Sequence, residues 1–129
     1  MKIVKPLIVS AAVSLAVLTA SSLAPAQDFA AGKKVFKRCI SCHTVEKGGR
    51  NKVGPNLWGV FSSTAGKRSI GYKYSSAILA SGIVWDDTSM SAFLENPRKA
   101  IPKTRMAFLG LKKSKQRDNV IAYLKSVTQ

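Results

Sequence analysis

The sequence predicts an all-α domain, because two separate segments carry apolar residues at the spacing of one helical face and no segment alternates like a strand. The first segment follows Asp28, a residue type that commonly caps helices, and the last begins near Ser114. The residues at this spacing are Gly32, Val35, Phe36 and Cys39 in the first segment, and Val120, Tyr123, Leu124 and Val127 in the last. We therefore expect the main helices at the two ends of the domain.

Two shorter helices are expected between these ends. One covers 75–81, and the other opens at Asp87 or Thr88. The second must end near Asn96, because Pro97 disfavours a helical conformation in the residue before it.

Two long segments of the chain, 44–69 and 98–113, are expected to be irregular. Glycine, lysine, asparagine and serine prevail in the first of them, and neither shows a sustained apolar period. A loop as long as the first is unusual in a compact domain unless it wraps around something. The sequence therefore indicates a domain whose loops enclose a bound group.

The first residues are typical of a secretory signal peptide. Two lysines precede an apolar run over 7–18, and Ala-Pro-Ala at 24–26 comes just before Gln27. The alternative is an uncleaved membrane anchor, but the run is shorter than the roughly 20 apolar residues that a span needs. We expect a signal peptide at 1–26, one soluble domain at 27–129, and export to the periplasm.

The expected mature chain is strongly basic. The whole sequence has 21 Lys and Arg and six Asp and Glu, and two of the basic residues lie in the signal peptide, which leaves 19 basic minus six acidic residues, or +13. An exported chain does not meet nucleic acid, and no nucleic-acid motif is present. A solvated lysine surface is the alternative, but so one-sided a charge favours a docking face for an acidic partner.

The only two cysteines stand together as Cys39-Ile40-Ser41-Cys42, with His43 next. This spacing is the signature of covalent haem attachment, in which both thiols bond to the macrocycle and the adjacent histidine ligates the iron. A thioredoxin-like redox pair would need a strand-helix-strand pattern, which is missing. A zinc site would need two more cysteine or histidine ligands, and His43 is the only histidine. We expect one haem c.

The second axial ligand of the iron decides between classes of protein, since enzymes and gas sensors need that position open. With the one histidine used, methionine is the natural candidate. Met90 shares a helical face with Phe93 and Leu94, which is typical of a core residue, whereas Met106 lies in an irregular stretch that can reach the metal. The spacing favours Met106, with loop packing as its alternative role.

The whole mature sequence resembles mitochondrial cytochrome c and its bacterial periplasmic relatives, the class I c-type cytochromes. The resemblance implies crossing N- and C-terminal helices, short helices and loops around one haem, axial ligation by His43 and Met106, and a single-electron carrier rather than an enzyme. The motifs that carry it are Cys39 to His43, Gly54-Pro55-Asn56-Leu57, Trp85, Asn96-Pro97-Arg98-Lys99, Ile101-Pro102, Lys103-Thr104-Arg105-Met106-Ala107-Phe108 and Ile121-Ala122-Tyr123-Leu124.

The resemblance also implies roles around the haem. Gly32 and Phe36 would cross the last helix near Val120 and Tyr123. The remaining pocket residues are Pro55, which would accept a hydrogen bond from His43, Tyr74 and Trp85, which would donate to a haem propionate, Thr104, beside the methionine loop, and Phe108, over the haem edge.

Three positions depart from the family pattern. Ser63 stands where an arginine usually lies near the propionates, Phe93 replaces a tyrosine near the methionine sulfur, and Ile78 replaces a buried asparagine. Each change removes a polar group from the surroundings of the haem. As a hypothesis, ligation by Met106 should persist to higher pH than in tyrosine-bearing relatives, and a pH titration that shows its loss at the same or a lower pH would contradict this.

Basic residues near the expected haem edge are the candidate docking surface, which we call the basic ring. It consists of Lys37, Arg38, Arg98, Lys99, Lys103, Arg105, Lys112 and Lys113. The expected partners of this monomer are acidic surfaces of redox complexes, such as a quinol-cytochrome c reductase and a terminal oxidase or photosynthetic reaction centre. Two rival classes are a haem peroxidase or gas sensor with an open iron, and a lysine-rich binder of membranes or polyanions.

Overall fold

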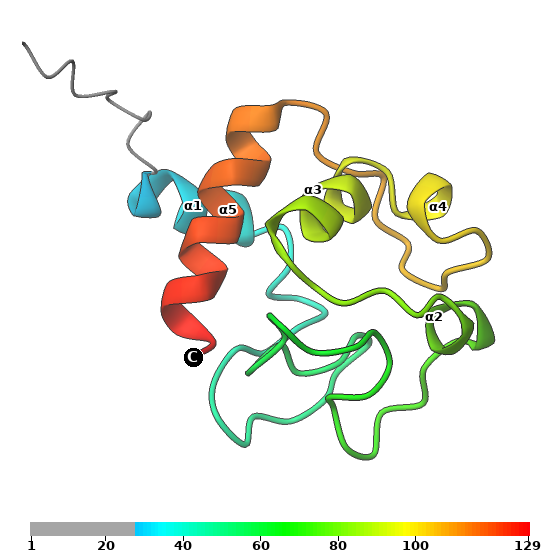
Figure 1. The fold of residues 1–129 in the computed structure, drawn as a ribbon. Helices are drawn as coiled ribbons and strands as arrows, with labels where there is room; N and C mark the ends of the chain where they lie inside the picture. Colours follow the sequence, from blue (N-terminus) through cyan, green and yellow to red (C-terminus); the bar gives the residue numbers. More distant parts are fainter. Residues whose placement is uncertain (1–27) are drawn as a thin grey trace, which may run out of the picture.

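The computed structural model describes residues 28–129, so the predicted signal peptide lies outside the described residues. The described chain forms five helices (Figure 1), and its only pairing of strand type is one isolated bridge between Thr64 and Val84. The helices are α1 (Phe29–Phe36), α2 (Ser76–Ala80), α3 (Asp87–Glu95), α4 (Pro97–Ala100) and α5 (Ser114–Val127). None of them is long and apolar enough to cross a membrane. The predicted all-α class is confirmed.

Helices α1 and α5 cross at a point that only glycine allows (Figure 1). A Cβ atom on Gly32 would lie 2.7 Å from the Cβ of Tyr123 and 2.8 Å from the carbonyl carbon of Asn119. The rings of Phe36 and Tyr123 pack beside the crossing, with centroids 5.5 Å apart. Asp28 caps α1, since its carboxylate accepts the backbone N–H of Ala31 at 2.9 Å. The expected cap and crossing are both confirmed.

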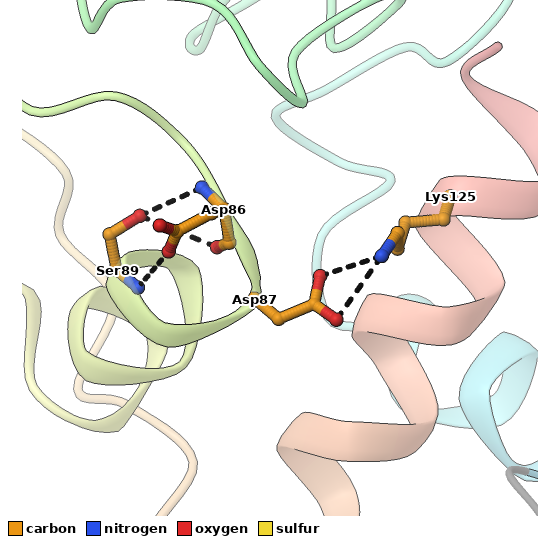
Figure 2. A network of polar contacts seen from close by, with 4 residues as sticks. All are labelled: Asp86, Asp87, Ser89 and Lys125. Carbon is orange, nitrogen blue, oxygen red and sulfur yellow. Dashed lines mark hydrogen bonds and ion pairs between the residues drawn. The ribbon is translucent and has the colours of Figure 1, made fainter.

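Helix α3 begins at Asp87, the first of the two predicted starts, and its cap is Asp86. The Asp86 carboxylate accepts the backbone N–H of Ser89 at 2.7 Å, and the Ser89 hydroxyl accepts the N–H of Asp86 at 2.9 Å (Figure 2). This reciprocal capping box satisfies two free N–H groups of the first turn. Asp87 also pairs with Lys125 at 2.8 Å, which joins α3 to α5 (Figure 2).

The prediction that the chain is irregular from residue 98 is wrong for its first residues, because Pro97–Ala100 form α4. Asn96 is extended, with φ −157° and ψ 92°, and ends α3. Its side chain then accepts the N–H of Lys99 at 3.2 Å and starts the next helix. Proline is favourable at the first position of a helix, where its missing N–H is not needed. Asn96 and Pro97 therefore end α3 and begin α4.

The core lies between the helix crossing, α3 and the loops that cover them. Arg117 joins α5 to α3 and to the segment before α5. Its Nε donates to the Ser91 hydroxyl at 2.9 Å, and its Nη1 donates to the Leu111 carbonyl at 2.7 Å. The buried apolar residues are Phe36, Val60, Ala65, Trp85, Met90, Phe93, Leu94, Ile101, Leu111, Val120, Ile121, Ala122 and Leu124.

Candidate functional site

The described residues enclose a cavity of about 350 Å³. Its walls are mainly apolar, and they come from α1, α2, α3 and α5 together with the segments that follow α1, α2 and α4. The apolar wall residues include Phe36, Leu57, Val60, Ile78, Phe93, Leu94, Leu111, Val120 and Leu124. All nine residues that the sequence analysis assigned to the site line this cavity: Cys39, Cys42, His43, Pro55, Tyr74, Trp85, Thr104, Met106 and Phe108.

Both cysteines lie on a turn that follows α1. The backbone N–H groups of Cys42 and His43 donate to the Cys39 carbonyl at 3.0 and 2.9 Å, which holds the three side chains together. Both thiols are half-buried and free. Burial raises the pKa of the Cys39 thiol to about 11, against an opposing effect of the Arg38 charge. A redox-active or nucleophilic cysteine needs a lowered pKa, so this environment does not suit a thioredoxin-like pair.

His43 is oriented by one hydrogen bond. Its Nδ1 lies 2.7 Å from the Pro55 carbonyl, which can only accept, so Nδ1 carries the proton and Nε2 keeps its lone pair. Burial lowers the pKa of His43 and so favours the neutral ring. A neutral imidazole whose second nitrogen is held by a carbonyl is the usual state of a histidine metal ligand. Gly54 allows this packing, because a Cβ there would lie 2.8 Å from Nδ1.

The segment after α4 brings Met106 to the cavity. Thr104, Met106 and Phe108 are half-buried in alternation with exposed residues, as expected for an extended segment with one face on the cavity. The Arg105 guanidinium donates to the Lys73 carbonyl and ties this segment to the loop before α2. Met90 also lines the cavity, but it lies on α3 and only 7% of its surface is exposed, in agreement with its predicted core role.

Polar side chains at the cavity include Tyr74 and Trp85, as expected. The Tyr74 hydroxyl accepts the N–H of Ser69 at 3.2 Å, and burial raises the Tyr74 pKa. Trp85 is buried against Phe93, with ring centroids 5.2 Å apart. Arg68 also lines the cavity, and the sequence analysis missed it. No local pattern in the loop 44–69 distinguishes this basic residue from its neighbours.

These groups fit a covalently bound haem. The cavity combines free thiols at Cys39 and Cys42, a neutral His43 with an available lone pair, the thioether of Met106 and apolar walls. Within the described residues, no group of three or more His, Cys, Asp and Glu could hold a bare metal ion.

Comparisons with known proteins agree with this chemistry. The family model described as Cytochrome c matches residues 29–128. Cytochrome c of Kluyveromyces lactis is 53% identical over 94 residues, which cover 72% of this chain and 84% of that protein. Cytochrome c of Gibberella zeae is 50% identical over 103 residues, or 79% of this chain and 96% of that protein. Among solved structures, cytochrome cH from Methylobacterium extorquens has a TM-score of 0.72 at 43% identity, covering 77% of this chain and 98% of that one.

Proposed function

Because this chain belongs to the cytochrome c family, we propose that it is a periplasmic electron carrier whose haem is held by Cys39, Cys42, His43 and Met106. Members of this family bind one covalently attached haem c and carry single electrons; they are not enzymes. This chain therefore has the cytochrome c fold and is a monohaem electron carrier.

The bound haem supplies a reversible one-electron couple, and the protein sets its potential and its access to solvent. Cys39 and Cys42 would form the thioether bonds, and the turn that joins them would carry His43 to the iron. The hydrogen bond to the Pro55 carbonyl would keep Nε2 of His43 aimed at the metal. The extended segment would present the Met106 thioether as the second protein ligand. With His43 and Met106 both held by their own segments, the protein would need little rearrangement when the haem changes oxidation state.

The hydrogen bond between His43 and Pro55 is the observation that carries the proposed ligation. It fixes the tautomer and the ring orientation in a cavity that both thiols and Met106 also line. Export to the periplasm is supported by the predicted signal peptide at 1–26. Cleavage before Gln27 is tested by expressing the full chain and sequencing the N-terminus of the periplasmic product. A product that keeps residues 1–26 would contradict export by this route.

The partners we propose are acidic docking surfaces on a quinol-cytochrome c reductase and on a terminal oxidase or photosynthetic reaction centre. Every member of the basic ring is exposed. Three of the six acidic residues lie elsewhere, in or just before α3 and in α5, namely Asp86, Asp87 and Asp118, whereas Glu95 adjoins Lys112 of the ring. Such charge raises the rate of encounter with an acidic partner and is screened by salt.

The docking proposal is tested by the rate of electron transfer to membranes that contain a terminal oxidase, measured at increasing ionic strength. We expect a steep fall in the second-order rate constant, and a slower reaction for Lys99→Glu at low salt. Lys47→Glu is the matched control, because Lys47 is exposed and lies outside the basic ring. A rate that salt does not change, or equal losses in the two variants, would contradict the docking proposal.

A further inference from the structure

Three side chains at the cavity have hydrogen-bond donors that no protein atom of residues 28–129 uses. The Tyr74 hydroxyl accepts from Ser69 and keeps its own proton to donate. The indole N–H of Trp85 and the Nη groups of Arg68 make no hydrogen bond to the described residues, and Arg68 is exposed where it lines the cavity. Ser63 lines the same cavity, but its proton is already given to the Val60 carbonyl at 2.5 Å. These donors are therefore free to bind an acceptor that enters the cavity, in exchange for water.

The Arg68 guanidinium lies directly against the backbone of Gly59, a residue without a side chain. Gly59 has φ +66°, and a Cβ there would lie 2.5 Å from both Nε and Nη2 of Arg68. The guanidinium rests on this bare backbone while its Nε donates to the Trp58 carbonyl at 3.2 Å. No carboxylate of the described residues lies within 4.0 Å of it. This exposed cation therefore lies at the cavity wall with no anionic partner from residues 28–129.

The two residues that follow Arg68 are fixed by hydrogen bonds. The N–H of Ser69 donates to Tyr74, and the Ser69 hydroxyl donates to the Asn51 side chain at 2.5 Å. The Asn51 amide donates in turn to the Ile70 carbonyl at 3.1 Å. The backbone directly after Arg68 is thus fixed beside Tyr74, while the Arg68 side chain itself bonds to the Trp58 carbonyl.

We infer that Arg68 pairs with a propionate carboxylate of the bound haem, at the end of the group to which the family resemblance already assigns Tyr74 and Trp85. This inference rests on the proposed function. Guanidinium and carboxylate form short, charge-assisted hydrogen bonds that can be bidentate. Arg68 would then supply, from a position five residues later in the same loop, the positive charge that Ser63 lacks.

A cation held beside the haem favours the reduced state, because the reduced iron carries one positive charge less. The other arginines of the cavity wall are placed differently. Arg38 lies beside Cys39, and Arg105 is bonded to the Lys73 carbonyl. Arg68 is the one whose neighbour in the chain, Ser69, is hydrogen-bonded to Tyr74.

The test is the reduction potential of the haem-loaded protein, measured by spectroelectrochemistry for Arg68→Met, Arg68→Lys and Lys67→Met. Lys67 is the matched control, because this neighbouring cation is exposed, as Arg68 is, but does not line the cavity. At a fixed applied potential, we expect Arg68→Met to lower the ratio of reduced to oxidised protein roughly three- to tenfold. A tenfold change corresponds to 59 mV for one electron. Arg68→Lys should recover part of the shift and Lys67→Met should show less than a third of it.

The absorption band of methionine ligation is recorded in every variant. An unchanged potential in Arg68→Met with this band intact, or equal shifts in Arg68→Met and Lys67→Met, would overturn the inference and leave the proposed function standing. Absence of the band in the unmutated protein would instead count against the proposed function.

Discussion

Lys103 lies three residues before Met106 with φ +66°, in the left-handed region that favours glycine. For a residue with a Cβ, this conformation costs about 1–2 kcal/mol. Lys103→Gly removes that cost but gives the opened chain more conformational freedom, which offsets about 0.5–1 kcal/mol. The net result should be a methionine segment that is more stable by roughly 0.5–1 kcal/mol, so that it opens roughly two- to fivefold less often.

The assay is the loss of methionine ligation at pH 7 in increasing guanidinium chloride, compared with global unfolding followed by circular dichroism. Lys103→Ala separates strain from the loss of the amine, because it keeps the Cβ. Ser62→Gly is the second control: Ser62 has φ +62° but lies outside the methionine segment, so this variant should stabilise only the global fold. If Lys103→Gly and Lys103→Ala lose methionine ligation at the same denaturant concentration, the strain argument is wrong.

Three further predictions concern the frame around the cavity. Gly32→Ala should lower the free energy of unfolding by about 1–3 kcal/mol, because the added Cβ meets the Asn119 backbone, and a more stable variant would contradict the crossing geometry. Arg117→Met should cost about 2–3 kcal/mol in denaturant unfolding through its lost charged hydrogen bonds to α3 and to the segment before α5, and a change below 0.5 kcal/mol would contradict that role. Hydrogen bonds from Ser89 lower the pKa of Asp86 below its ordinary 3.8, so the folded state prefers the charged carboxylate. The stability that this carboxylate contributes is therefore present above pH 3.8 and lost as pH falls through the pKa of the folded state. Asp86→Asn should therefore lose less stability than the unmutated protein between about pH 5 and pH 3, as measured by thermal unfolding, and parallel pH curves would contradict this.

The sequence predicted those parts of the molecule that local chemistry decides. The two end helices were predicted from the spacing of apolar residues and from the capping residue Asp28. Haem attachment was predicted from two cysteines separated by two residues and followed by a histidine. Helix α4 was missed, because four residues are too short for a period to be visible. Asn96 ends one helix and caps the next, and only its extended conformation reveals both roles.

The polar part of the cavity was predicted less completely. Tyr74 and Trp85 were found through the family resemblance, whereas Arg68 was missed. Its place depends on the left-handed conformation of Gly59 and on a carbonyl ten residues away, and neither is visible in the order of residues. Met106 was favoured over Met90 by its place in an irregular stretch and then by the resemblance, and both residues line the cavity.

Axial ligation by His43 and Met106 is the central claim, and the ferric absorption spectrum of the haem-loaded protein tests it most directly. Met106→Ala is compared with Met90→Leu, its matched control, which removes the other thioether of the same cavity. The account predicts a low-spin spectrum with a weak far-red band in the unmutated protein and in Met90→Leu, and loss of the band in Met106→Ala. A band that survives in Met106→Ala or disappears in Met90→Leu, or a high-spin spectrum in the unmutated protein, would contradict it.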